Sequence, residues 1–303
     1  MGFCDGRVVI VTGAGRGLGR AHALAYAAEG AHVLVNDLGV HSDGSEPRAD
    51  DAATAVVDEI VAAGGSAAAN HADVADWEQA GAMVAQAIDM WGRLDTLVCN
   101  AGFLRDRMLV NMNEQEWDAV VRVHLKGHFV PSRHAVAHWR ERQKASGGDA
   151  PAARIVNTSS GAGLMGSIGQ GNYVAAKAAI AALTIQQAAE WGRYGVLANA
   201  IAPDARTRMT AVIPGYPERP DDGWDPKAPG NVSSLVVWLG SADCDVSGRV
   251  FECTGGQLNV CDGWQHGPVV SVGDRAMTVA EAAALARLSV EAEEPPAPVY
   301  GTR

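Results

Sequence analysis

Tyr173 and Lys177 stand four residues apart in the stretch "GQGNYVAAK" (169–177). Side chains with this spacing share one face of a helix. An ammonium group close to a phenol favours the phenolate and lowers its pKa from the usual ~10. Such a tyrosine can accept and release a proton in general acid–base catalysis. Because YxxxK is a short motif that often occurs by chance, a surface tyrosine beside a solvated lysine is the alternative interpretation.

A glycine-rich stretch, "TGAGRGLGR" (12–20), directly follows the first apolar run of the sequence. Its spacing is Gly13-xxx-Gly17-x-Gly19, which differs from GxGxxG. Glycines at a strand-to-helix turn let a pyrophosphate approach the backbone N–H groups of a helix N-terminus. The stretch therefore predicts a dinucleotide site.

Asp37 ends the second apolar run of the sequence. A carboxylate at this place accepts hydrogen bonds from the adenosine ribose and repels a 2′-phosphate. Arg16, within the glycine-rich stretch, would instead attract that phosphate. We weigh Asp37 more heavily and expect NAD, with NADP as the less favoured coenzyme.

The composition indicates a globular enzyme: 48% of the 303 residues are hydrophobic and 19% are charged. The net charge of −11 argues against a nucleic-acid partner. The five cysteines form no CxxC pair, which favours free thiols in a reducing compartment and predicts no metal site. Without a recognisable signal peptide or an apolar run of ~20 residues, we expect a cytoplasmic protein with no membrane span.

Apolar runs alternate with helical patterns along the chain, which predicts an α/β fold. We expect a single-domain, Rossmann-type, doubly wound parallel sheet of about seven strands with helices on both faces. The strands are predicted at 7–13, 32–37, 66–74, 94–102, 153–160, 195–203 and 248–256, and the helices at 18–29, before 64–65, at 77–91, around 114–140, around 173–177 and near 278–288.

Three polar stretches interrupt this alternation, at 39–50, 143–152 and 213–231, and they are predicted to be loops. The last of them follows a predicted strand and is expected to cover a substrate. Residues 1–265 are predicted to form the dinucleotide-binding and catalytic domain. The proline-rich extension at 266–303 is expected to be a packing arm.

From 5 to 263 the chain resembles the short-chain dehydrogenase/reductase family. The resemblance rests on TGxxxGxG (12–19), an acidic strand end, "ADV" (72–74), "CNAG" (99–102), a serine 13 residues before the tyrosine, and YxxxK. It implies that Ser160 binds the reacting oxygen and that Tyr173 transfers the proton. Lys177 would bind the nicotinamide ribose and lower the pKa of Tyr173. The cofactor-binding residues that it implies are Gly13, Arg16, Gly17, Leu18, Gly19, Asp37, Asp73, Val74, Asn100, Ala101, Gly102, Tyr173, Lys177 and Pro203.

Three positions depart from the family pattern. Cys99 replaces the first asparagine of "NNAG" and is expected to be a buried thiol. His124 stands where many members have a catalytic asparagine, so it either takes part in the proton relay or holds the helix backbone. Pro203-Asp204 replaces the family's Pro-Gly after the sixth strand.

Several stretches, including "VHLKGHF" (123–129) and "VFECTGG" (250–256), are similar to the (3R)-hydroxyacyl-CoA dehydrogenase unit of peroxisomal multifunctional enzyme type 2 and its bacterial relatives. This resemblance implies NAD-dependent interconversion of a secondary alcohol and a ketone, on a 3-hydroxyacyl-CoA or a hydroxysteroid, by a homotetramer or homodimer of lipid metabolism. Two alternatives stay open. One is an NADPH-dependent 3-oxoacyl reductase, and the other is a dinucleotide-sensing scaffold without catalysis.

Overall fold

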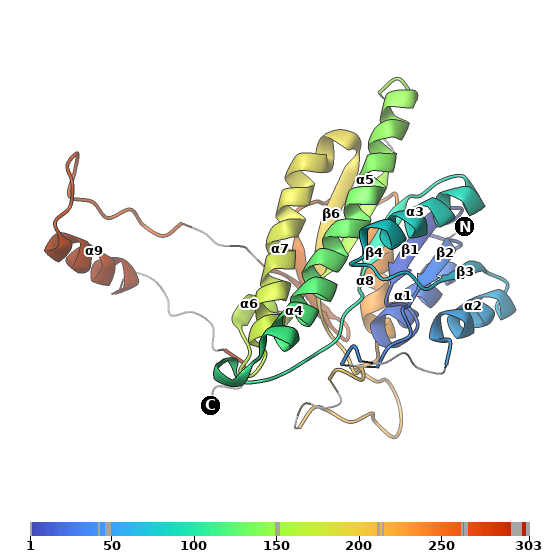
Figure 1. Cartoon of the computed structure of the whole chain (residues 1–303), viewed down its shortest axis with the longest axis horizontal. Coiled ribbons are helices and arrows are strands. Elements are labelled where there is room, and N and C mark those ends of the chain that lie inside the picture. Colours follow the sequence, from blue (N-terminus) through green and yellow to red (C-terminus); the bar gives the residue numbers. More distant parts are fainter. Residues whose placement is uncertain are drawn as a thin grey trace.

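The computed structural model of the chain describes residues 2–41, 43–45, 50–148, 152–210, 213, 215–261, 263, 266–291 and 299–300. Within these residues one sheet of eight strands has the order β3-β2-β1-β4-β5-β6-β7-β8 (Figure 1). The strands are β1 (Val8–Thr12), β2 (His32–Asn36), β3 (Ser66–Asn70), β4 (Thr96–Cys99), β5 (Ala153–Thr158), β6 (Val196–Asp204), β7 (Val250–Thr254) and β8 (Gln257–Cys261). The pairings from β3 to β7 are all parallel, which confirms the predicted sheet.

Strand β8 was not predicted and adds an eighth strand to the sheet of about seven that was expected. It pairs antiparallel with β7 through a two-residue turn at Gly255-Gly256. β8 is an edge strand whose residues are mostly exposed, and the polar–apolar alternation of its sequence, QLNVC, extends over only five residues. The two glycines between two short extended segments were the available hairpin signal.

Helices cover both faces of the sheet, as predicted (Figure 1). One core packs the sheet against α1 (Gly17–Ala28), α2 (Ala52–Ala62) and α8 (Gly230–Gly240). The other packs it against α3 (Trp77–Trp91) and α5 (Gly127–Ala145), with part of α7 (Gly171–Trp191). The remaining helical elements are η1 (Leu109–Asn111), α4 (Glu114–Val121), η2 (Arg122–Lys126), α6 (Gly161–Met165), η3 (Gly192–Tyr194) and α9 (Val279–Glu291).

The helix predicted around 114–140 is interrupted. A π-helical turn, η2, joins α4 to α5, and α5 continues to Ala145, into the predicted loop at 143–152. The extra residue in a π-turn rotates the side chains that follow relative to those before it. His124 lies in this turn and is buried. A regular helix would present a different face here to the neighbouring α7.

The order of the sheet places a crevice at the carboxyl ends of β1 and β4. β1 and β4 are neighbours in the sheet; the strand after β1, β2, lies on one side of this pair, and the strand after β4, β5, lies on the other side. Ligands of open α/β sheets bind at such a switch in strand order. The glycine-rich turn follows β1 and the segment with Asn100 follows β4, so both reach this crevice.

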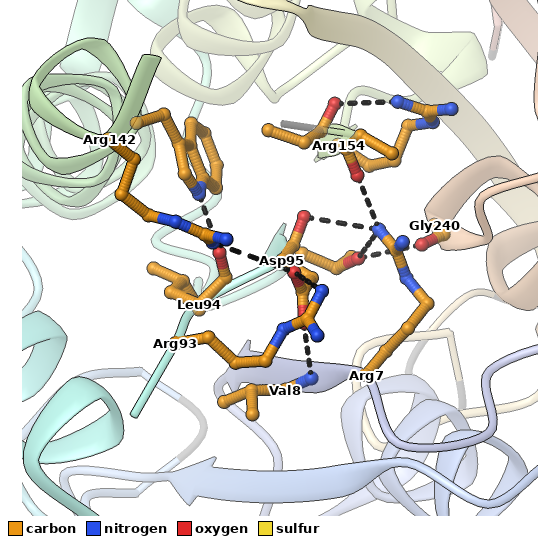
Figure 2. Close-up of polar contacts among 12 residues, drawn as sticks. Arg7, Val8, Arg93, Leu94, Asp95, Arg142, Arg154 and Gly240 are labelled. Atoms are coloured by element: carbon orange, nitrogen blue, oxygen red, sulfur yellow. Dashed lines mark hydrogen bonds and ion pairs between the residues drawn. The ribbon is translucent and has the colours of Figure 1, made fainter. Parts of the chain in front are cut away.

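A buried polar cluster closes the opposite, amino-terminal edge of the sheet (Figure 2). The carboxylate of Asp95 accepts a hydrogen bond from the N–H of Val8 (2.9 Å) and from Arg93 (2.8 Å). Arg7 donates to the carbonyl of Ala152 (2.8 Å) and to the hydroxyl of Thr96 (3.0 Å). These contacts tie the starts of β1, β4 and β5 together, because buried charges are stable only when they are paired.

The carboxyl-terminal extension lies largely away from this body. Helix α9 buries none of its residues, and Figure 1 shows it well apart from the sheet. The chain returns at Tyr300, whose backbone oxygen accepts a hydrogen bond from the N–H of Ile168 (2.9 Å). Its N–H donates to the carbonyl of Gly166 (3.2 Å). The end of the described chain therefore contacts the segment between α6 and α7.

Candidate active site

The glycine-rich turn is held tightly against the end of β4. Gly13 has a φ of +61°, and a Cβ atom there would lie 2.7 Å from the Cα of Ala101. The side-chain amide of Asn100 donates to the carbonyls of Thr12 (3.0 Å) and Gly13 (3.1 Å). Asn100 thus shapes the turn as well as lining the crevice. Only glycine fits at position 13, for steric and conformational reasons.

Helix α1 begins at Gly17 with no side-chain cap. Its N-cap residue, Arg16, makes no side-chain capping bond, and the first turn contains no acidic residue. The first N–H groups of a helix have no intrahelical partner and carry a partial positive charge. This helix start is therefore available to an anion such as a pyrophosphate.

Asp37 is fixed at the end of β2 by two backbone donors. Its carboxylate accepts hydrogen bonds from the N–H of Gly15 (2.9 Å) and the N–H of Gly39 (2.8 Å). A Cβ atom at Gly15 would approach this carboxylate to 2.8 Å, so the glycine permits the contact. The guanidinium of Arg16 forms an ion pair with Asp50, across the same cleft.

These features line a cavity of about 330 Å³. Its wall includes the following predicted cofactor residues: Gly13, Arg16, Gly17, Leu18, Gly19, Asp37, Asp73, Val74, Asn100, Ala101 and Gly102. An uncapped helix start, a closely packed glycine turn and an oriented carboxylate at the second strand are the groups that a nicotinamide dinucleotide requires. The residues present fit such a cofactor.

A second cavity, of about 710 Å³, shares Leu18, Asn100, Gly102, Thr207 and Met209 with the first. The structure brings the remaining predicted residues together in its wall: His124, Ser160, Tyr173, Lys177 and Pro203. They come from η2, the start of α6, α7 and β6. A large compartment thus opens beside the compartment that fits the dinucleotide.

Ser160 and Tyr173 both line this cavity, and the hydroxyl of Ser160 lowers the pKa of the Tyr173 phenol. The hydroxyl of Ser160 also accepts from the N–H of Ala162 (3.2 Å), as the N-cap of the short helix α6. Burial raises the pKa of Tyr173 to about 12, and the hydroxyl of Ser160 opposes that shift. The serine and the phenol can therefore bind one substrate oxygen together.

Lys177 is fully buried one turn further along α7. Its Nζ lies 5.5 Å from the ring centroid of Tyr173 and donates to the carbonyl of Thr158 (2.7 Å). Burial lowers the pKa of Lys177 to about 7. The expected lowering of the Tyr173 pKa by this ammonium is not seen. Loss of solvation dominates at the phenol, and the ammonium donates to a backbone carbonyl instead.

His124 packs edge-on against Tyr173, with the ring centroids 5.2 Å apart. Its Nε2 lies 2.8 Å from the carbonyl oxygen of Phe103, and its Nδ1 has no partner among the described residues. Burial holds the pKa of His124 well below its usual value, so the imidazole is neutral. If Nε2–H donates to Phe103, Nδ1 is a free acceptor in the site.

His128 was not predicted from the sequence to be part of the site. Its Nδ1 donates to the backbone oxygen of His124 (2.7 Å), and its Nε2 accepts from the N–H of Thr158 (3.3 Å). The carbonyl of Thr158 accepts a hydrogen bond from Lys177. The buried His128 therefore connects the π-turn to the residue that binds the ammonium of Lys177. The spacing of His124 and His128, four residues apart on a predicted helix, was the signal available for it.

Three carboxyl groups and several distant segments in the cavity wall were also missed. Asp106, Asp204 and Glu252 line it, as do Gln257 and Asn259 of β8 and Tyr300 of the extension. Asp204 and Glu252 lie in stretches that were compared with the family, but no pattern in those stretches marked them as cavity residues.

Comparison with known proteins identifies the family. The short chain dehydrogenase model matches residues 7–214. The chain is 48% identical over 262 residues to hydroxyacyl-CoA dehydrogenase ChsB1 of Mycobacterium tuberculosis, covering 84% of this chain and 80% of that protein. It is 42% identical over 254 residues to the peroxisomal multifunctional enzyme type 2 of Mus musculus, covering 84% of this chain but 32% of that protein.

A solved structure gives the same result for the whole fold. The crystal structure of a short chain dehydrogenase from Mycobacterium avium superposes with a TM-score of 0.88 at 57% identity, covering 99% of this chain and all of that one. No helix in the described part of the chain is long and apolar enough to cross a membrane. With the predicted glycine turn, serine, tyrosine and lysine gathered around two joined cavities, the chain belongs to the short-chain dehydrogenase family and is an oxidoreductase acting on CH–OH groups.

Proposed function

We propose that the protein oxidises the hydroxyl of a 3-hydroxyacyl-CoA to the ketone with NAD. The observation that carries this proposal is the meeting of Ser160, Tyr173 and Lys177 in a 710 Å³ cavity that joins the cavity fitted to a dinucleotide. The 48% identity to a hydroxyacyl-CoA dehydrogenase supports the substrate class. A hydroxysteroid is the second candidate, because a cavity of this volume accommodates a fused-ring group.

In the proposed reaction Ser160 donates a hydrogen bond to the substrate oxygen and Tyr173 accepts the hydroxyl proton. A nicotinamide cofactor bound in the smaller cavity would supply the hydride acceptor. Lys177 binds the nicotinamide ribose, and its positive charge stabilises the phenolate of Tyr173. Burial raises the pKa of Tyr173 to about 12, which opposes the phenolate, and a positive charge on Lys177 would favour it.

His124 and His128 have positioning roles in this proposal. The neutral imidazole of His124 holds the Phe103 segment in place and supports the ring of Tyr173. A proton-relay role for His124 would use its free Nδ1. A His124→Asn variant tests the positioning role against the relay role. An asparagine can replace the hydrogen bond to Phe103 but lacks the aromatic ring that packs against Tyr173.

NAD is the proposed coenzyme, with Asp37 as the residue that selects it. A carboxylate fixed by two backbone N–H groups suits the ribose hydroxyls and repels a 2′-phosphate. We further propose that residues 1–265 form the catalytic domain and 266–303 an accessory arm, and that the protein is a cytoplasmic homotetramer or homodimer.

The test is a comparison of steady-state rates for 3-hydroxyacyl-CoAs, hydroxysteroids and short alcohols, with NAD and with NADP, followed by absorbance at the reduced nicotinamide band. We expect the highest kcat/KM for a 3-hydroxyacyl-CoA with NAD. Tyr173→Phe is the matched control: it should lose roughly 10²–10⁴-fold in kcat while NAD binding is retained. A short polyol that outperforms every acyl-CoA and steroid would overturn the substrate class, and near-normal turnover by Tyr173→Phe would overturn the mechanism.

A further inference from the structure

Asp204, the residue that replaces the family's glycine after Pro203, ends β6 at the rim of the larger cavity. Its carboxylate forms an ion pair with Lys227 and accepts a hydrogen bond from the hydroxyl of Tyr216 (2.7 Å). Thr254, its neighbour on β7, lies 3.3 Å from the same carboxylate and accepts from Lys227 (2.9 Å). One carboxylate thus holds residues that lie 12 and 23 positions later in the chain.

These contacts matter because the segment 205–229 has no helix or strand among its described residues. One backbone hydrogen bond, from the N–H of Arg206 to the carbonyl of Lys227 (2.7 Å), joins the beginning and the end of the segment. The guanidinium of Arg206 adds an ion pair with Asp225 and a hydrogen bond to the carbonyl of Glu218 (2.8 Å). The position of the segment therefore depends on a few side chains at its base.

Of these groups, Asp204 and Thr254 belong to the sheet, and Asp204 is the charged one. Arg206 and Asp225 both lie within the segment, so their ion pair ties the segment to itself. Asp204 ties it to the rigid ends of β6 and β7 instead. Hydrogen bonds between charged groups are about twice as strong as neutral ones. The Lys227 side chain is 19% exposed and that of Asp204 is 43% exposed, so solvent screens this pair in part.

The cavity wall connects this anchor to the substrate. Asp204, Tyr216, Thr207 and Met209 all line the larger cavity, so the segment forms one side of the space for the substrate. A glycine at position 204 could make none of the side-chain contacts described above. We propose that Asp204 is a positioning residue that fixes the segment 205–229 to the sheet and so sets the width of the substrate cavity. The consequence for catalysis rests on the proposed function, whereas the consequence for the segment does not.

Hydrogen exchange measured by mass spectrometry tests the anchor without any substrate. In Asp204→Asn and in Lys227→Met, peptides from 205–229 should exchange about tenfold faster than in the wild type. Lys227→Arg keeps the charge and should retain most of the protection. Arg275→Met removes a surface ion pair with Glu281 and is the matched control, with no change expected at 205–229. Unchanged exchange in both Asp204→Asn and Lys227→Met would overturn the proposal, even if every variant folds normally.

Kinetics of the same variants test the link to the substrate. We expect Asp204→Asn and Lys227→Met to raise KM for a bulky 3-hydroxyacyl-CoA about tenfold, with little change in the KM for NAD. The double variant should be no worse than either single variant, because both remove the same interaction. Equal losses with NAD and acyl substrate, or fully additive effects, would contradict a positioning role. If no acyl-CoA is turned over by the wild type, the proposed function fails, while the exchange experiment still decides whether Asp204 is the anchor.

Discussion

Replacing Lys177 with methionine should make the protein more stable at neutral pH while removing its activity. The wild-type lysine is fully buried, and burial lowers its pKa from 10.5 to about 7. Each pKa unit corresponds to ~1.36 kcal/mol, so holding the protonated lysine in the folded state costs about 5 kcal/mol. Methionine has a similar length and carries no charge to desolvate.

The expected gain is smaller than this cost, because methionine leaves the carbonyl of Thr158 without its donor. An unsatisfied buried acceptor costs ~1–3 kcal/mol. We therefore expect Lys177→Met to raise the free energy of unfolding by about 2–4 kcal/mol at pH 6–7. The gain should be visible as a shift of the urea midpoint at a fixed protein concentration.

The gain should also depend on pH in a defined direction. Below pH 7 both folded and unfolded wild-type chains carry the charged lysine, so the full cost is present. Between pH 7 and 10.5 the unfolded chain binds more protons than the folded one, and wild-type stability rises with pH relative to the variant. Near pH 10.5 the difference should vanish or reverse, because only the lost hydrogen bond remains.

Urea unfolding of both proteins at pH 6, 8 and 10, without nucleotide, measures this difference directly. Leu or Gln at position 177 would not match the lysine's shape as well, so methionine is the preferred replacement. A variant that is less stable than the wild type at pH 6, or a difference that does not change between pH 6 and 10, would refute the reasoning. Added NAD should stabilise the wild type more than the variant, if Lys177 binds the nicotinamide ribose.

Three further changes test other parts of the structure. Asp37→Ala should raise the kcat/KM ratio of NADP to NAD, because it removes the carboxylate that repels a 2′-phosphate. Adding Asp50→Asn should raise the ratio further by releasing Arg16 from its ion pair, and equal ratios for the single and double variants would contradict this. Asp95→Ala should lower the free energy of unfolding, measured with urea, by ~1–3 kcal/mol, because it leaves the buried N–H of Val8 without a hydrogen-bond acceptor. The KM for NAD should not change, because Asp95 lies at the edge of the sheet opposite the active site. Removing residues 266–303 should leave the circular dichroism of the sheet intact, because helix α9 buries none of its residues. The truncation should change KM for the acyl substrate, because Tyr300 is lost from the cavity wall. A truncated chain that no longer folds would refute the proposed domain boundary at residue 265.

Much of the architecture could be predicted from local sequence. Continuous apolar runs separated by helical patterns require a parallel sheet with two covered faces, and a glycine-rich turn after the first strand locates the crevice. The four-residue spacing of Tyr173 and Lys177 was sufficient to predict that they share a helix face, and the family resemblance implied that Ser160 joins them. These features depend on residues that are close in sequence or on a regular repeat.

Other features were decided only by tertiary structure. The π-turn that buries His124, the hydrogen bonds of His128 and the pKa values of Tyr173 and Lys177 depend on which groups exclude water around them. Desolvation is a property of the packed neighbours and leaves no local pattern in the sequence.

The wall of the substrate cavity shows the same limit most clearly. Sequence reasoning took Asp204 only as a departure from the family pattern and placed Tyr300 in a packing arm, yet both line the cavity. The partners of Asp204 are Tyr216 and Lys227 of the segment 205–229 and Thr254 of β7. A single carboxylate in a sequence does not specify its partners, because long-range contacts are chosen by the folded chain as a whole.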